Sequence, residues 1–596
     1  MARRLGQTAA GRLWRQRRLR GRSPLAWLAL VAIAALALRL AWLGRRAVHF
    51  DEARVGVEVL RYLHTGEFLY FPALHGPVLF HVDRALFAWF GPSDLVLRLP
   101  VAVVGGLLPL AAWLFRDHLD DREVVALGVV MAANPLLLYY SRFARSDLLV
   151  AAFMVVTLGC GLRLRATGRA RYLYAGTAAL ALGLASKENA LLYLLSWAGA
   201  ASVLAAARLT RRPAFEMSAI GDRLRNDRRW LAHGGIAGVQ LVALVTVLYA
   251  PRGGERPRLG QLLAFPDGLA VVEAATVGSA RRLLAIWVYG GGHPVDVYLW
   301  YLGQLLALLV VTSLPLLFFA TVGLLADWRR RGNGGDSRIP SWLRRLRRAL
   351  RRPRPLVAFS LLWAASAVVG YPFASDLVAA WTAVHVVVPL AVPAAIGLAA
   401  TWRAARGADA RRRRRLAGSG LLVAAAVVGS VGGWSSYAAP GAPYNPFGQP
   451  GQPEADFRKT MVTVERVAAT NAGPDVVYVG DFYAERIWQL PFEWYLAPAG
   501  VTSTTRSLPL EDPPPVVVAL DVHAETLGRH LAGYRCVEHD PYPWGGFKPG
   551  GRQTETVVFV EEGTPTSRGS RWRPATHCGP ETAGDRPVAR RLEQLG

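Results

Sequence analysis

Apolar runs recur along most of this chain, and they decide what it can fold into. A run of about 20 apolar residues is long enough to cross the hydrocarbon core of a bilayer as an α-helix. Hydropathy indicates about eleven such runs, and 52% of the 596 residues are hydrophobic. We therefore predict a polytopic α-helical membrane protein. The expected spans are Pro24–Leu43, Val96–Phe115, Glu123–Tyr140, Leu148–Leu164, Tyr172–Ala185, Ala190–Ala207, Gly234–Ala250, Leu302–Leu325, Leu356–Tyr371, Ala383–Thr401 and Leu416–Tyr437.

Arginine accounts for nearly all of the formal net charge of +27, and it is concentrated in blocks between the apolar runs. In a soluble protein such an excess favours nucleic acid as a partner, but here membrane topology explains it better. With about eleven spans, the long basic blocks all fall on the side of the N-terminus. They are Arg3–Arg22, Arg208–Arg229, Arg329–Arg354 and Arg403–Arg415. The positive-inside rule then predicts a cytoplasmic N-terminus, an extracytoplasmic C-terminal part and no nucleic-acid partner.

The composition divides the chain into four parts. We expect a basic cytoplasmic N-terminus at residues 1–23, a transmembrane domain at 24–437, a Pro- and Gly-rich linker at 438–453 and an extracytoplasmic α/β domain at 454–596. The first outer loop, residues 44–95, is predicted to contain an amphipathic helix and an apolar helix lying at the membrane interface. These two helices are expected at Ala53–His64 and Pro77–Phe90.

The C-terminal part alternates short apolar runs with helical patterns, which is typical of a small α/β domain. Strands are expected at Val476–Val479, Val516–Leu520 and Thr556–Val560, and helices at Thr460–Thr470 and Ala484–Tyr495. Two cysteines of this part, Cys536 and Cys578, could pair in an oxidising compartment, and the sequence leaves that pairing open.

Ionisable residues gather where the predicted spans meet the outer face. Because charges beside or inside a membrane are costly, such residues are candidates for function. The acidic pair Asp51-Glu52 offers a general base, with Glu52 either supporting Asp51 or holding a divalent cation. Cationic and histidine side chains are candidates for binding a lipid phosphate, and further polar groups could support them or a metal. The first set is Arg142, Arg145, Lys187, His75 and Arg98, and the second is Asp147, Glu188 and His293.

Most of these residues also have a purely structural interpretation. The acidic pair could be a solvated turn, and Arg142 and Arg145 could reach toward headgroup phosphates. Asp147 could cap a helix. Lys187-Glu188 could be a local ion pair, and the two histidines, His75 and His293, could be turn residues that precede Gly-Pro and Pro. These alternatives remain open at the level of sequence.

Several segments resemble a known group of membrane enzymes. Asp51-Glu52 in a first outer loop, followed by Arg98-Leu99-Pro100 at the next span, resembles the GT-C glycosyltransferases, especially the protein O-mannosyltransferase and aminoarabinose-transferase branch. Other segments are similar to the archaeal family of flippase-activity-associated glycosylation proteins. They are Ala73–His81, Tyr139–Asp147, Ser186–Asn189 and Trp488–Leu496.

The resemblance implies an extracytoplasmic active site, a polyprenyl (dolichyl-type) phosphate-linked sugar as donor and Asp51 as the base. It places His75-Gly76-Pro77 where aminoarabinose transferases have a Lys-Pro-Pro phosphate contact. Relatives often have a Lys-containing Pro-Trp motif where this chain has Ser375–Trp381, which contains neither the lysine nor the proline.

The favoured hypothesis is therefore a membrane-embedded glycosyltransferase that moves a sugar onto an outward-facing glycan or protein acceptor, with membrane lipid around it. No cofactor is required by this hypothesis, and a divalent cation is left open. The alternatives are a flippase component and a non-catalytic accessory subunit of a lipid-linked glycan pathway.

Overall fold

A computed structural model describes most of the chain. The described residues are 23–72, 75–209, 228–254, 257–287, 295–330, 354–374, 379–407, 411–442, 445–448, 452–453, 456–468, 470–471, 473–479, 486–508, 510–539, 556–563 and 572–578. They fall into two compact units, one within residues 1–42, 65–82 and 98–438, and the other within residues 43–64, 83–97 and 439–596.

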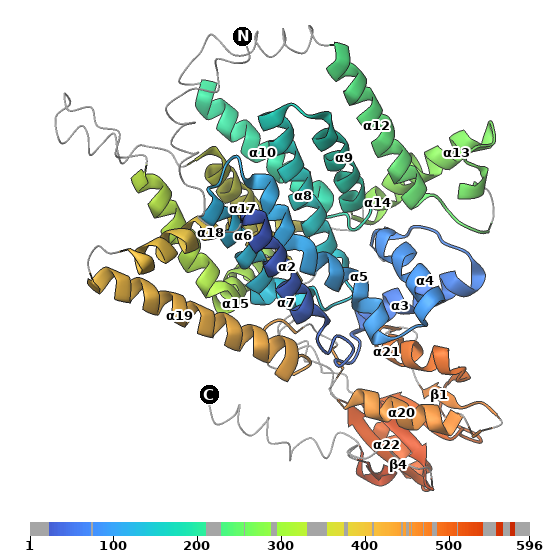
Figure 1. The fold of residues 1–596 in the computed structure, drawn as a ribbon. Coiled ribbons are helices and arrows are strands. Elements are labelled where there is room, and N and C mark those ends of the chain that lie inside the picture. The colour runs from blue at the N-terminus through green and yellow to red at the C-terminus, as the bar shows by residue number, and fades with distance from the viewer. Residues whose placement is uncertain are drawn as a thin grey trace, which may run out of the picture. The chain divides into compact units, whose positions relative to one another are not determined.

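The first unit is a bundle of helices (Figure 1). Its helices are α2 (Pro24–Leu40), most of α5 (Asp94–Leu107), α6 (Asp121–Ala133), α7 (Pro135–Tyr140), α8 (Ser146–Thr167), α9 (Ala170–Leu184), α10 (Ala190–Leu209), α12 (Arg228–Tyr249), α13 (Asp267–Glu273), α14 (Ser279–Trp287), α15 (Val295–Arg330), α17 (Pro355–Ala374), α18 (Val384–Arg406) and α19 (Arg411–Gly433). The segment around α18 is the most buried of the long apolar helices, whereas the segments around α12 and α19 expose most of their apolar side chains. Exposed apolar faces of this kind suit helices that contact lipid.

Within the described residues, seven helices are long and apolar enough to cross a membrane. They are Asp94–Phe115, Ser146–Thr167, Arg229–Tyr249, Tyr298–Trp328, Pro355–Phe373, Ala380–Arg406 and Arg411–Ala438. Two shorter apolar helices are Pro24–Leu40 and Ala190–Ala206. The multi-pass, mostly helical fold class is thus confirmed, and every predicted span coincides with helical structure. The count of about eleven crossings and the orientation of the termini stay predictions.

Two of the predicted spans differ in detail from the observed helices. The run Glu123–Tyr140 is divided at Asn134, where α6 ends and α7 begins with Pro135. Proline lacks the backbone N–H that a continuing helix needs, and the Asn134 side chain caps the new helix by accepting from the Leu137 N–H. The run Val96–Phe115 continues from α5 into a 3-10 helix at Leu108–Phe115. Within Tyr139–Asp147, only residues 141–145 form a short irregular turn, because Tyr139 and Tyr140 end α7 and Ser146 and Asp147 begin α8.

The second unit contains residues 43–64 and 83–97, which make up most of the first outer loop, and the C-terminal α/β domain. The loop provides α3 (Phe50–Thr65), which includes the predicted amphipathic helix, and the end of α4 (Val78–Phe90), which matches the predicted interfacial helix. The domain provides α20 (Phe457–Ala468), α21 (Arg486–Leu496) and α22 (Asp521–His530). It also contains a sheet with the order β2-β1-β3-β5-β4-β6. The strands are β1 (Val476–Val479), β2 (Ser503–Arg506), β3 (Val516–Leu520), β4 (Tyr534–His539), β5 (Thr556–Glu561) and β6 (Arg573–Pro574).

The central strands of this sheet are covered on both faces. β1 pairs in parallel with β2 and β3, whereas β5 pairs antiparallel with β3 and β4. Residues of α20 and α21 pack against one face, and residues of α22 pack against the other (Figure 1). Strands buried on both sides are expected to be continuously apolar rather than alternating. This is why β1, β3 and β5 were recognisable as short valine-rich runs.

The two cysteines of this domain form a disulfide between Cys536 on β4 and Cys578 near the end of the described chain. The sequence had left their pairing open. The bridge closes a loop with a sequence separation of 42 residues. Closing a loop of this size removes conformational entropy from the unfolded chain and is worth about 2–4 kcal/mol.

Replacing both cysteines by serine is therefore expected to lower the free energy of unfolding of the C-terminal domain by about 2–4 kcal/mol. Thermal unfolding of the detergent-solubilised protein, with and without reductant, measures this. Reductant should destabilise the wild type and leave the double variant unchanged. Equal unfolding temperatures for the wild type under both conditions would contradict a stabilising bridge.

Candidate active site

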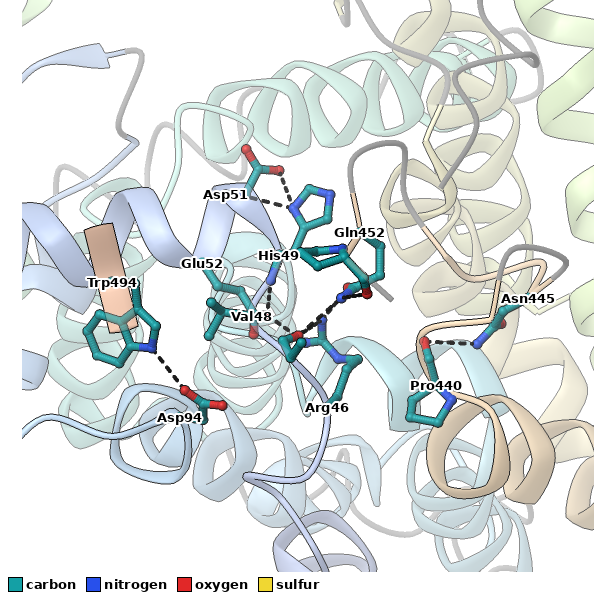
Figure 2. A network of polar contacts seen from close by, with 12 residues as sticks. Arg46, Val48, His49, Asp51, Glu52, Asp94, Pro440, Asn445, Gln452 and Trp494 are labelled. Atoms are coloured by element: carbon teal, nitrogen blue, oxygen red, sulfur yellow. Dashed lines mark hydrogen bonds and ion pairs between the residues drawn. The ribbon is translucent and has the colours of Figure 1, made fainter. Parts of the chain in front are cut away.

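The acidic pair occupies the first turn of α3, and its two members have different surroundings. Glu52 is fully buried and accepts a hydrogen bond of 2.7 Å from Arg46 Nη2. The same carboxylate oxygen accepts the backbone N–H of His49 at 3.0 Å. His49 precedes the first helical residue, so Glu52 satisfies an N–H group at the helix start that has no partner within the helix. Figure 2 shows this network. Of the two roles considered for Glu52, this geometry favours supporting its neighbour.

Asp51 is the accessible member of the pair. Its side chain is 26% exposed, whereas that of Glu52 is 0% exposed. His49 Nδ1 lies 3.7 Å from Asp51 Oδ2 and accepts the backbone N–H of Asp51 at 3.1 Å. Because a ring nitrogen that accepts a hydrogen bond carries no proton of its own, Nδ1 does not donate to the carboxylate. The Asp51 carboxylate is therefore partly accessible, whereas that of its neighbour Glu52 is fully buried.

A second cluster of charges is centred on Asp147, the second residue of α8. Arg145 Nε donates to Asp147 Oδ2 at 3.1 Å, and Lys187 Nζ donates to Asp147 Oδ1 at 2.7 Å. All three side chains are buried, and both cations lie over the ring of Trp381, at 5.0 Å and 3.9 Å from its centroid. A carboxylate between two cations compensates their burial and fixes their directions. Asp147 thus pairs with Arg145 and Lys187 and does not cap the helix.

The Asp147 cluster includes residues that the sequence analysis missed. His385 of α18 is fully buried, with Nε2 at 3.3 Å from Asp147 Oδ1 and Nδ1 at 2.8 Å from the Tyr193 hydroxyl. The ring of Tyr371 stacks on the imidazole at 4.6 Å between centroids. An ionisable side chain inside a predicted apolar span was the signal that could have identified His385. Trp381 is the last residue of Ser375–Trp381, the segment that lacks the lysine and proline often found in relatives. Residues Ser375–Val378 of that segment lie outside the described residues.

Lys187 is followed by Glu188, and the two do not form the local ion pair considered from the sequence. Glu188 Oε1 accepts the hydroxyl of Tyr70 at 2.7 Å, and Oε2 lies 3.4 Å from His75 Nδ1. Burial opposes ionisation of Glu188, but the contacts with His75 and Tyr70 outweigh it and lower the pKa of the carboxyl. Burial, reinforced by the charge of Lys187, lowers the pKa of His75, so its imidazole is neutral at pH 7. Burial also lowers the pKa of Lys187, against the pull of Asp147.

The loop that contains His75 is anchored to the turn before Glu188. Gly76 N–H donates to the Ser186 carbonyl at 3.2 Å, and Val78 N–H donates to the Ala185 carbonyl at 3.0 Å. A Cβ atom at position 76 would lie 2.2 Å from the Ala185 oxygen, so only glycine fits. His75 itself has a φ of 68°, a strained value for a residue with a side chain. The close approach at Gly76 thus holds His75 beside Glu188.

Gly76→Ala is therefore expected to separate the loop from the turn and to destabilise the protein by about 2 kcal/mol or more. Gly161→Ala is the matched control, because a Cβ atom at position 161, inside α8, meets no atom within 4 Å. Alanine favours a helix interior over glycine by about 1 kcal/mol, so this control should be neutral or stabilising. Thermal unfolding of both variants measures the effect. Equal unfolding temperatures would mean that the close approach at Gly76 is not needed.

The remaining predicted residues have other surroundings. Arg142 Nη1 donates to the carbonyls of Arg39 and Ala41 at 2.8 and 2.6 Å, and its guanidinium lies over the Tyr437 ring. It therefore caps the C-terminal end of α2, and its predicted phosphate contact stays untested. Arg98 is fully buried in α5. His293 lies outside the described residues.

No group of three or more His, Cys, Asp or Glu side chains that could hold a metal ion occurs in the described part of the chain. Of the residues considered for a metal, Asp147 is paired with cations and Glu188 lies beside a neutral histidine and a tyrosine. The acidic pair belongs to one compact unit and the Asp147 cluster to the other. Their union in a single site stays a prediction.

Two sequence families match the chain. Residues 457–561 match the family described as the Agl23 flippase-associated protein C-terminal domain. Residues 74–220 match the family described as dolichyl-phosphate-mannose-protein mannosyltransferase, and they include His75, Arg145, Asp147 and Lys187. No curated protein matches the chain in sequence.

The chain is also similar to solved structures of ArnT from Cupriavidus metallidurans. The structure in the apo state has a TM-score of 0.52 at 14% identity, covering 89% of this chain and 98% of that one. The structure bound to undecaprenyl phosphate has a TM-score of 0.51 at 14% identity, covering 91% of this chain and 99% of that one. At this identity the likeness concerns the fold.

Proposed function

We propose that this chain, which belongs to the GT-C membrane glycosyltransferases and has an Agl23-type C-terminal domain, transfers a sugar from a polyprenyl-phosphate carrier to an outward-facing acceptor. The family and the fold class that the sequence predicted are confirmed. The donor class is supported by the match to dolichyl-phosphate-mannose-dependent transferases and by the similar ArnT structure that binds undecaprenyl phosphate.

The observation that carries the proposal is the division of labour within the acidic pair. Glu52 is locked in a buried ion pair, so Asp51 remains as the accessible carboxylate next to it. A partly exposed carboxylate at a fixed position suits a general base that accepts the proton of an acceptor hydroxyl. Arg145 and Lys187 would bind the phosphate of the donor and stabilise it as the leaving group.

The reaction then follows from these assignments. The acceptor oxygen attacks the anomeric carbon of the sugar as its proton passes to Asp51. The bond between that carbon and the phosphate oxygen breaks, and its electron pair stays on the polyprenyl phosphate. A phosphate is a weak base and leaves without a strong general acid, while the cations stabilise the charge that develops on it. The disulfide of the C-terminal domain agrees with an oxidising, extracytoplasmic side for that domain.

The test is a transfer assay with the purified full-length protein in lipid. A radiolabelled polyprenyl-phosphate sugar is added with membrane extract as the source of acceptors, and released polyprenyl phosphate and labelled acceptor are both measured. The proposal predicts equal amounts of the two products. Movement of the labelled lipid across vesicles without product would favour a flippase component. A full loss of cellular glycan on deletion of the gene, with no transfer by the protein, would favour an accessory subunit.

A further inference from the structure

The turn that contains the acidic pair is bonded to Tyr495 of the C-terminal α/β domain and to Gln452 of the segment before that domain, and Figure 2 shows the contacts of Gln452. Immediately before His49 in the chain, the Val48 N–H donates to the Tyr495 hydroxyl at 3.0 Å. Gln452 Nε2 also donates to the Ala47 carbonyl at 3.1 Å. Gln452 Oε1 also accepts from Arg46 Nη1 at 2.6 Å, and Arg46 in turn pairs with Glu52, which follows His49. Contacts on both flanks leave residues 49–51 little freedom to move.

Tyr495 is itself held by a carboxylate. Its hydroxyl donates to Asp94 Oδ2 at 3.0 Å while it accepts from Val48. The indole N–H of Trp494 donates to the other oxygen, Asp94 Oδ1, at 2.9 Å. Asp94 is 5% exposed, and Arg458 Nη1 lies 3.5 Å from it. A buried carboxylate that accepts several hydrogen bonds orients each of its donors. Asp94 therefore fixes the direction of the Tyr495 hydroxyl toward the backbone of Val48.

Trp494 adds a steric contact to the same arrangement. A Cβ atom at Gly56 would lie 2.4 Å from Trp494 Cε3, so the indole packs directly against the backbone of α3. The Phe87 ring also packs against the Trp494 ring, with 5.7 Å between their centroids. The helix whose first turn contains Asp51 is thus positioned by an aromatic residue of the C-terminal domain. Only a residue without a side chain at position 56 allows this approach.

We propose that Tyr495 and Asp94, with Gln452 as a second tie, are positioning residues that hold the Asp51 carboxylate in its working place. The C-terminal domain is then a structural part of the catalytic turn rather than a separate module. This inference rests on the proposed function, because it gives Asp51 the role of base. A displacement of about 1 Å at a reacting group costs up to about a hundredfold in rate, so loss of one tie has a measurable effect.

The test compares conservative variants of the full-length protein in the transfer assay. Tyr495→Phe keeps the ring and removes the hydroxyl that joins Val48 to Asp94. Its kcat is expected to fall about tenfold with the donor KM within about twofold, since the acid turn and not the donor site is disturbed. Asp94→Asn and Gln452→Met are expected to lower kcat in the same way. Because Tyr495→Phe removes only one hydroxyl group, it decides the test even if Asp94→Asn or Gln452→Met accumulates poorly.

Tyr534→Phe is the matched control. Tyr534 belongs to the same domain, and its hydroxyl donates to the carbonyls of Pro513 and Pro514 at 3.1 Å, with no contact to the acidic turn in the described residues. Both Tyr→Phe variants should lower the unfolding temperature by similar small amounts, but only Tyr495→Phe should lower kcat. An unchanged kcat in Tyr495→Phe would overturn the positioning role.

A further arm separates this inference from the proposed function. If Asp51→Asn is inactive while Tyr495→Phe and Gln452→Met turn over like the wild type, the positioning role is wrong and the base assignment stands. If Asp51→Asn itself transfers sugar at the wild-type rate, the base assignment is wrong, and the positioning role is wrong with it because Asp51 is then not the base.

Discussion

Asp51→Asn is expected to reduce sugar transfer by about two to four orders of magnitude while leaving the protein folded. An amide cannot take the proton of the acceptor hydroxyl, and general base catalysis typically contributes about 10²–10⁴ to a rate. The side chain keeps its size, and Asp51 is the more exposed member of the pair, so the unfolding temperature should change little. Turnover of the labelled donor by the purified variant, beside its thermal unfolding, measures both.

The neighbouring substitution Glu52→Gln should show the reverse pattern. It leaves the buried Arg46 with a neutral partner in place of a carboxylate, which lowers stability, because a buried cation without its counter-charge is costly. Its transfer rate should fall far less than that of Asp51→Asn. Equal losses of rate without loss of stability in both variants would show that the two carboxylates act together and that the division between them is wrong.

Lys187→Met is expected to reduce kcat/KM for the lipid donor by about a hundredfold or more, since removal of a preorganised charge at a developing anion costs about that much. Lys187 Nζ lies in a buried cluster, 2.7 Å from Asp147 and over the ring of Trp381. Methionine keeps most of the length of the side chain but removes the ammonium group and its contact with the Trp381 ring. Arg145 still pairs with Asp147 in the variant, so the carboxylate is not left without a cation.

Lys459→Met is the control for this change, because Lys459 is an exposed residue of α20 in the C-terminal domain. Its kinetic parameters should equal those of the wild type. Steady-state kinetics over a range of donor concentrations measure kcat/KM, and retention on immobilised polyprenyl phosphate measures binding of the lipid phosphate. Wild-type donor binding and turnover in Lys187→Met would remove the phosphate assignment from the Asp147 cluster.

The sequence predicted the helices and the central strands because their signals are local. The apolar runs gave the helical spans, and the valine-rich runs gave β1, β3 and β5. β2 was missed because Ser503–Arg506 is an exposed strand of polar residues with no apolar pattern. The helix predicted at Thr460–Thr470 starts earlier than predicted, at Phe457, and for the one predicted at Ala484–Tyr495 the described residues Arg486–Leu496 are helical. Helix ends depend on caps and on packing, which local propensity records weakly.

The candidate site was only partly predictable, because its partners are distant in sequence. Asp51, Glu52, Arg145 and Lys187 stood out as charges at predicted membrane boundaries. The sequence could not separate the roles of Asp51 and Glu52. Glu52 is buried in its ion pair with Arg46, and Arg46 is held by Gln452, which is 406 residues away in the chain. Asp94 was missed because a carboxylate in the first turn of a helix needs no further explanation in the sequence.

The mass of the surface glycans in living cells tests the central claim most directly. Three otherwise identical strains are compared: one with the wild-type chain, one with Asp51→Asn and one from which the gene is deleted. The account predicts that the Asp51→Asn strain makes the same truncated glycans as the deletion strain while its membranes contain the protein at the wild-type level. Wild-type glycans in the Asp51→Asn strain, beside truncated glycans in the deletion strain, would contradict it.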